Sequence, residues 1–179
     1  MVALASMRDG SGGEYSVLFS AAGAYVGGFG HESPMSPCAQ DGEPWPGVLD
    51  GVPSVFRPWV EEPAFTDEDS VPLVTACIWR EEASDTRWRH GTIDFPTGHD
   101  DPDRANRLFR LLVDGSPEAY RRFAEDYYEV PVDLEAVRHV YASRPLTADV
   151  VSSLNTQTTS DLAGEIGETG YPGTGRDSA

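Results

Sequence analysis

The chain contains no lysine: all thirteen of its basic residues are arginines, against thirty Asp and Glu residues. A protein without lysine has no side chain that can form a Schiff base, anchor pyridoxal phosphate or serve as the lysine of a phosphate-binding loop. The enzyme classes that depend on those groups are therefore excluded.

Cysteine is almost as scarce. Cys38 lies in a proline-rich stretch and Cys77 in an apolar one, and this arrangement indicates neither a metal site nor a redox pair. The N-terminus is too short and too weakly apolar for an export signal, so we expect a cytoplasmic protein with two reduced thiols, a disulfide between them remaining open. No apolar run is long enough to span a bilayer, and no membrane partner is expected.

Negative charge is what the chain has in excess, with a formal net charge of -17 over 179 residues. Such a protein is repelled by nucleic-acid phosphates and attracted to basic surfaces. Apolar residues make up 39% of the chain and aromatic residues 10%, which is too much for a disordered acidic tail. We predict a single domain over residues 14–169, with flexible ends at 1–13 and 170–179.

Four segments alternate their side chains with the period of a β-strand. They form two pairs, each joined by a short turn, which predicts two β-hairpins. Glycines in the second segment suggest a bulge or a close approach of another part of the chain. The four segments are 14–20, 24–29, 73–80 and 88–95.

Residues 31–72, between the hairpins, are irregular and rich in proline. The plainer interpretation is a packed connection that covers one edge of the sheet through Trp45, Phe56, Trp59 and Phe65. Long irregular connections are also often functional, so this stretch is the first place to look for a binding surface.

The pattern after Pro96 is helical. A first helix is predicted over 103–114, where Gly115 ends it. The order of elements predicts an α+β protein: two N-terminal β-hairpins form a four-stranded, mostly antiparallel sheet that four to five C-terminal helices cover. The predicted N-caps of the later helices are Ser116, Asp133, Thr147 and Ser160.

His31 and Glu32 follow a glycine-rich strand end, which is a frequent setting for catalytic groups. One imidazole and one carboxylate make neither a triad nor a chelate without partners. Bonds from these side chains to the backbone of their own loop are the plainer interpretation.

His99, Asp100 and Asp101 precede the first predicted helix and are candidate ligands for a divalent cation. Aspartates at that position are more often N-caps that complement the helix dipole. The sequence does not show whether His31, His90 and His99 converge, and no metal or other cofactor is predicted.

Several enzyme signatures are missing from the chain. There is no glycine-rich phosphate loop before a helix, no Gly-x-Ser-x-Gly, no His-Glu-x-x-His and no Cys-x-x-Cys. Their absence favours a role other than catalysis.

Acidic residues are concentrated before the strand predicted at 73–80. The plainer interpretation is a solvated surface. The functional one is an electrostatic face that attracts a basic partner, with aromatic side chains as contact points. The residues predicted for that face are Trp45, Trp59, Glu61, Glu62, Asp67, Glu68 and Asp69.

Three stretches carry a resemblance as a set: GFGHESPMSP at 28–37, YRRFAEDYYE at 120–129 and EIGETGYP at 165–172. Together they resemble small acidic proteins of unknown function encoded by GC-rich actinobacteria, over most of residues 14–172. The resemblance implies no activity and no site residue. In size, acidity and mixed layout, the chain is also similar to bacterial immunity proteins, which neutralise toxin partners.

The sequence therefore favours an acidic cytoplasmic protein-interaction module, an immunity-like or regulatory binder of a basic protein partner. Two alternatives remain. One is a small enzyme or a metal- or ligand-binding protein that uses the His31-Glu32 loop, and the other is a nucleic-acid mimic. No direct nucleic-acid binding is expected, and the oligomeric state is not predicted.

Overall fold

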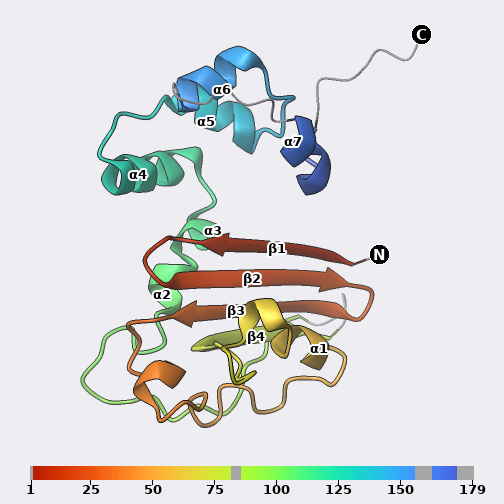
Figure 1. Ribbon diagram of the computed structural model, residues 1–179, viewed down its shortest axis with the longest axis vertical. Helices are drawn as coiled ribbons and strands as arrows, with labels where there is room; N and C mark the ends of the chain where they lie inside the picture. The colour runs from red at the N-terminus through yellow and green to blue at the C-terminus, as the bar shows by residue number, and fades with distance from the viewer. Residues whose placement is uncertain (1, 82–85, 156–162, 173–179) are drawn as a thin grey trace. The chain divides into compact units, whose positions relative to one another are not determined.

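The computed structural model describes residues 2–81, 86–155 and 163–172, and Figure 1 shows their secondary structure. Contacts within the chain separate a sheet unit, Met1–Arg110, from a helical unit, Leu111–Ala179. We describe the two units one at a time. The expectation of one domain over residues 14–169 stays a prediction.

Four antiparallel strands form one sheet in the order β1-β2-β3-β4 (Figure 1). Helices follow the sheet in the sequence, so the predicted α+β class with a four-stranded antiparallel sheet is confirmed. The strands are β1 (Ala3–Arg8), β2 (Gly13–Ser20), β3 (Gly23–Gly30) and β4 (Ala76–Arg80).

The membership of the sheet differs from the prediction at two places. Residues 3–8 form β1, where we expected a flexible end, and residues 88–95 form no strand. Only Arg89 pairs with β4, through two backbone hydrogen bonds with Trp79. The reason lies at Gly91, where a Cβ atom would stand 1.9 Å from the carbonyl oxygen of Gly47. This close contact of two backbones holds the segment away from the sheet.

The proline-rich connection supplies four of the nine buried residues of the core cluster. It packs against one face of the sheet, not only along an edge as we expected, and its Phe56 is completely buried. The connection contains three short helices: η1 (Pro37–Ala39), α1 (Arg57–Val60) and η2 (Pro63–Phe65). The buried cluster consists of Leu18, Tyr25, Val48, Val52, Phe56, Val60, Val74, Cys77 and Trp79.

Thr75, which is fully buried, fixes three segments at one end of the sheet. Its hydroxyl accepts a hydrogen bond from the amide of Gly30 at 3.1 Å and donates one to the carbonyl of Asp103 at 2.7 Å. Its own amide donates to the carbonyl of Gly28 at 2.8 Å. The end of β3, the start of β4 and the loop before α2 (Ala105–Leu108) are thereby held together.

The other face of β3 receives the end of α2 at a glycine. A Cβ atom on Gly28 would lie 2.7 Å from the ring of Phe109 and 3.1 Å from Leu108, so only glycine fits there. The ring of Phe109 also contacts Tyr15 of β2, with 5.8 Å between centroids. The close approach predicted from the glycines of this segment is therefore present.

In the helical unit, α4 packs against α5 and α5 against α6. The predicted caps are confirmed: Ser116, Asp133 and Thr147 each accept a hydrogen bond from a backbone amide of the helix that follows. Ser160 lies outside the described residues. The helix predicted at 103–114 is two short ones, α2 and α3. The remaining bounds are α3 (Arg110–Asp114), α4 (Pro117–Tyr128), α5 (Leu134–Tyr141), α6 (Ala148–Leu154) and α7 (Ala163–Thr169).

Arg138 of α5 connects two helices of this unit through ion pairs with Glu118 of α4, at 2.5 Å, and with Glu135, at 2.6 Å. These pairs are solvent-exposed, so they orient the helices more than they stabilise them.

Within the described ranges, no helix combines the length and the apolar character needed to cross a bilayer.

We predict that Thr75→Val destabilises the protein by about 2 kcal/mol or more, because the Gly30 amide and the Asp103 carbonyl lose their buried partner while the side-chain volume stays the same. Urea unfolding followed by tryptophan fluorescence measures the change. The control is Thr97→Val, which makes the same substitution at an exposed threonine. Equal stability of the two variants would show that the Thr75 hydroxyl does not hold these segments.

Candidate functional site

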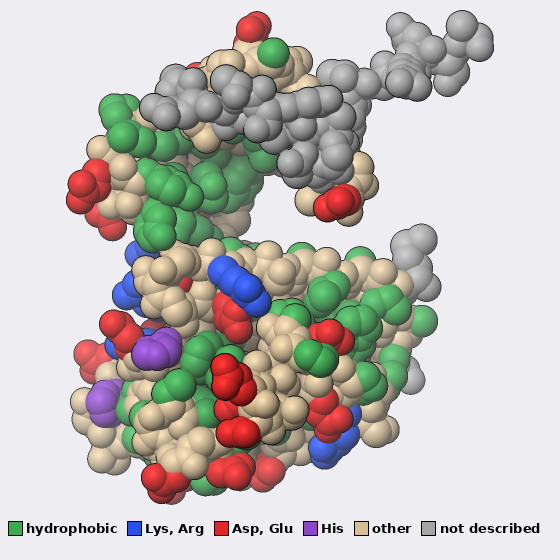
Figure 2. All heavy atoms as spheres, viewed as in Figure 1, with side chains coloured by type: hydrophobic (Ala, Val, Ile, Leu, Met, Phe, Trp, Pro, Cys, Tyr) green, Lys and Arg blue, Asp and Glu red, His purple; other side chains and the backbone are tan. Residues whose placement is uncertain are grey.

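Two loops singled out in the sequence line one open groove in the sheet unit, with a volume of about 770 Å³. One loop follows β3 and the other precedes α2. Figure 2 shows histidine side chains at one edge of the sheet unit, with acidic and arginine side chains beside them. The lining residues are His31, Glu32, Ser33, Pro34, Cys38, Ala39, Gly98, His99, Asp100, Asp101 and Arg104.

The first wall of the groove is a tightly packed turn. Ser33, Met35 and Ser36 are almost completely buried, although they lie outside any strand. The Ser33 hydroxyl accepts a hydrogen bond from the Met35 amide at 2.9 Å and donates one to the carbonyl of Pro102 at 2.6 Å. Because Pro102 belongs to the second wall, this bond sets the two walls in a fixed relation.

The second wall is held by aspartates that cap α2. Asp101 accepts hydrogen bonds from the amides of Asn106, at 3.1 Å, and Arg107, at 3.2 Å. Asp103 accepts one from the amide of Ala105 at 3.1 Å. The capping interpretation of this acidic stretch therefore holds for Asp101, whereas Asp100 is exposed and caps nothing.

Arg104 is the groove residue that the sequence analysis missed. Its backbone is left-handed, with φ of 62°, which is strained for a residue other than glycine. It lies against Gly30, where a Cβ atom would be 2.7 Å from both Cβ and Cγ of Arg104. The glycine-rich end of β3 thus makes room for this arginine. The glycines were the available signal, but the sequence does not say which residue approaches them.

The guanidinium of Arg104 lies 3.7 Å from the carboxylate of Glu32, measured from Nη2 to Oε2. The Arg104 side chain is 34% exposed and that of Glu32 is 72% exposed, so the pair contributes little to stability. The distance exceeds that of a good hydrogen bond. Both groups therefore keep their hydrogen-bonding capacity for another molecule.

The groove carries more negative than positive charge. Three carboxylates, on Glu32, Asp100 and Asp101, face one guanidinium. In the same loop, burial raises the pKa of Asp103, and the nearby carboxylate of Asp101 adds to the rise. A ligand that enters this groove must therefore bring positive charge of its own.

The candidate metal ligands do not form a metal centre in the part of the chain that the structure describes, where no three His, Cys, Asp or Glu side chains are placed to hold an ion. His31 and His99 line the same groove, but His90 does not. The Nδ1 atom of His90 lies 2.7 Å from the carbonyl oxygen of Gly91.

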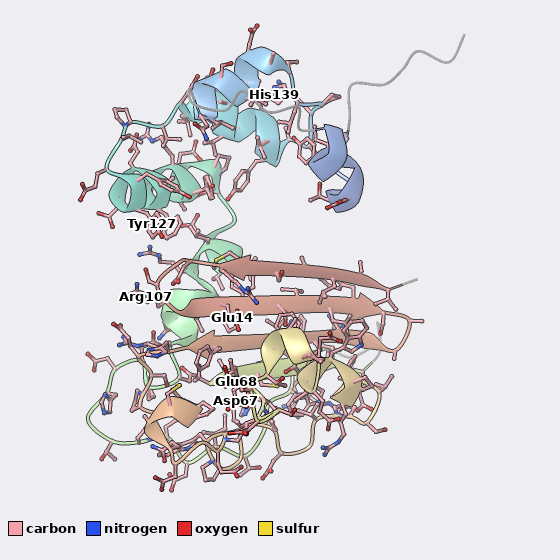
Figure 3. All side chains as sticks on the ribbon, viewed as in Figure 1. Glu14, Asp67, Glu68, Arg107, Tyr127 and His139 are labelled. Atoms are coloured by element: carbon pink, nitrogen blue, oxygen red, sulfur yellow. The ribbon has the colours of Figure 1, made fainter. Side chains whose placement is uncertain are left out.

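The acids predicted for a binding face lie after α1 and along the turn that leads to β4. Asp67 closes that turn by accepting hydrogen bonds from the amides of Asp69, at 3.0 Å, and Val71, at 2.8 Å. Figure 3 shows Asp67 and Glu68 on the same side of the sheet unit as Glu14. Glu14 pairs with Arg8 at 2.8 Å, and Arg8 donates a hydrogen bond to the carbonyl of Ala64. Strands β1 and β2 are thereby linked to this segment.

The two tryptophans predicted for the same face are half-buried. Trp45 donates a hydrogen bond from Nε1 to the carbonyl of Asp94 at 3.0 Å, and Trp59 packs against the core cluster. Each therefore has a structural role, and only its exposed edge is available to a partner. The most exposed aromatic side chains of the described sheet unit lie elsewhere, at Phe19, Trp88 and Phe95.

The two cysteines are free and lie in opposite environments. Cys38 is exposed and lines the groove, whereas Cys77 is buried in the core. Burial raises the pKa of the Cys77 thiol to about 12. Only Cys38 is available for reaction with a molecule from solution.

Comparison with protein-family models, with curated proteins and with solved structures gave no match. Function is therefore argued from the geometry of the groove and of the acidic surface alone.

We predict that Asp103→Asn stabilises the protein at neutral pH and has no effect in strong acid. The folded state raises the pKa of Asp103, so the folded protein binds more protons than the unfolded one. Stability attributable to this group is full below its unfolded pKa and falls as pH rises through the folded pKa. The amide oxygen of asparagine still accepts the Ala105 hydrogen bond. Thermal melts across pH, with Asp100→Asn as control, test this; a loss of stability at neutral pH would contradict it.

We further predict that a maleimide reagent at neutral pH modifies one thiol of the native protein rapidly. Cys38→Ser should remove that rapid reaction, because Cys77 is buried and its thiol pKa is about 12. In Cys77→Ser the rapid reaction should persist. Mass spectrometry of time points distinguishes the two sites, and rapid labelling of Cys77 would show that the core of the sheet unit opens readily.

Proposed function

We propose that this protein is an acidic cytoplasmic binder of a basic protein partner, of the immunity-like or regulatory kind. Its contact surface would be the acidic face, which we define as Glu61, Glu62, Asp67, Glu68 and Asp69 together with the exposed edges of Trp45 and Trp59. The observation that carries the proposal is that none of these five carboxylates forms an ion pair with another described residue.

Ion pairing leaves the carboxylates of the acidic face uncompensated in the part of the chain that the structure describes. None of the ion pairs between described residues includes one of these five acids. Elsewhere arginines are used for pairing, as with Glu14, Glu32 and Glu118. The field of the acidic face therefore extends into solvent, where it can act on a partner within about 10 Å at moderate salt.

The backbone that carries these acids is ordered. The amide of Asp67 donates to the carbonyl of Val71 at 2.9 Å, and the amide of Leu73 donates to that of Phe65 at 2.9 Å. Val60, directly before Glu61, belongs to the buried core. Charges on a fixed scaffold give complementarity at a smaller entropic cost than charges on a flexible tail.

Neutralising the acidic face should slow association with the partner. The variant replaces Glu61, Glu62 and Glu68 by Gln and Asp67 and Asp69 by Asn, and Asn at 67 keeps an oxygen for the turn. We expect the association rate constant at low salt to fall about tenfold or more, because complementary fields accelerate encounter by roughly that factor or above. Stopped-flow mixing with the partner that the wild-type chain captures from host lysate measures the rate.

The control variant removes the same charge from exposed acids outside the face: Glu43→Gln, Asp50→Asn, Asp94→Asn, Asp126→Asn and Glu129→Gln. The proposal requires that the face variant slows association more than the control, and that high salt abolishes the difference. An equal effect of the two variants would mean that net charge alone acts. Failure of the wild-type chain to capture any basic protein would contradict the proposed function itself.

A further inference from the structure

The groove between the two loops presents polar side chains to solvent. The side chains of His31, Glu32, His99, Asp100 and Arg104 make no hydrogen bond to any described residue, and the long Glu32–Arg104 ion pair is their only charge contact there. These groups include both signs of charge. They differ in this from the acidic face, which carries one sign only.

The backbone of Arg104 is strained where it places the side chain in the groove. Its left-handed backbone, with φ of 62°, is a strained conformation for a residue other than glycine. The absence of a side chain at Gly30 is what admits its Cβ and Cγ atoms. A guanidinium has five donors in a planar fork that matches a carboxylate, and here that fork has no acceptor at hydrogen-bonding distance among the described residues.

The spacing of the two charges restricts the ligand. Because Nη2 of Arg104 and Oε2 of Glu32 are only 3.7 Å apart, the groups that would bind to them must be neighbours in the ligand. An α-amino acid has this property, since its carboxylate and its ammonium group are attached to one carbon atom. A simple anion would satisfy Arg104 but would be repelled by Glu32, Asp100 and Asp101.

We propose that the groove is a binding site for a free α-amino acid. Arg104 receives the α-carboxylate, Glu32 and Asp100 accept hydrogen bonds from the α-ammonium group, and Cys38 of the first wall and His99 of the second wall face the amino-acid side chain. The volume of about 770 Å³ falls within the range of roughly 300–1,000 Å³ that is usual for small-molecule sites. This site does not depend on the acidic face or on a protein partner.

The groove is open to solvent, so we expect modest affinity, with dissociation constants on the order of a millimolar. The two walls are already joined by the Ser33–Pro102 hydrogen bond, and binding therefore needs no rearrangement of the loops. Preorganisation of this kind keeps a polar, exposed site selective even where its affinity is low.

Titration of the ¹⁵N-labelled full chain with each of the common amino acids, followed by amide shifts of residues 31–33, 98–101 and 103–104, tests the proposal. We expect saturable shifts with at least one amino acid. For that amino acid, the N-acetyl derivative lacks the ammonium group and the carboxamide lacks the carboxylate. Each derivative should bind about tenfold more weakly or not at all, since each loses a charge-assisted contact.

The variants address the protein side of the same contacts. Glu32→Gln and Arg104→Gln should each weaken binding about tenfold. Arg110→Gln is the matched control, because it removes an exposed arginine that lines neither the groove nor the adjoining hollow beside His31 and Glu32. Glu32 is largely exposed, so its substitution leaves the fold intact even if Arg104→Gln disturbs the contact with Gly30.

Three results would overturn the proposal. They are the absence of saturable shifts with every amino acid, binding of the N-acetyl derivative or the carboxamide as tightly as the parent, and wild-type affinity in both groove variants. Because none of these measurements uses a protein partner, the site and the proposed function of the acidic face stand or fall separately.

Discussion

The hydroxyl of Thr75 occupies the point on which the architecture of the sheet unit depends. By accepting from Gly30 and donating to Asp103, it joins the last residue of β3 to the loop that precedes α2. These two segments are far apart in the sequence, and both walls of the groove begin at them. Because Thr75 is fully buried, solvent does not readily replace either bond, and these bonds act together with the Ser33–Pro102 hydrogen bond to set the geometry of the groove.

A net charge of -17 is compatible with a folded sheet unit because the charges lie outside a core that the proline-rich connection completes. The prolines limit the conformations of the unfolded connection, which reduces the entropy lost when it packs onto the sheet. Phe56 and Val48 occupy the interior, while Glu61, Glu68 and Asp69 in the same connection face solvent. One segment therefore supplies both the apolar contacts of the core and the acidic face.

Local rules predicted the local features. Ser116, Asp133 and Thr147 were identifiable as caps because a cap requires only a side-chain oxygen and the next amides. The alternation of side chains located β2 and β3. The same pattern was wrong for residues 88–95, because the backbone contact between Gly47 and Gly91 outweighs the strand preference of that segment. Strand β1 was missed because Ala and Ser have weak strand preference. The histidine and acidic residues of the groove were named individually. These residues come together, and Arg104 joins them, through contacts between segments that are distant in the sequence. A local sequence pattern does not predict such contacts.

Because the protein is strongly negative overall, the presence of Arg104 in this groove restricts the kind of ligand that can bind there. A free carboxylate or phosphate approaching the protein meets the repulsion of the acidic surface before it reaches Arg104. A ligand that carries an ammonium group beside its carboxylate avoids that repulsion, since Glu32 attracts one group while Arg104 attracts the other. Under the two proposals, the acidic face selects molecules by net charge and the groove selects them by the separation of two charges, which is 3.7 Å between Arg104 and Glu32. A large basic protein satisfies the first requirement, and a small zwitterion satisfies the second.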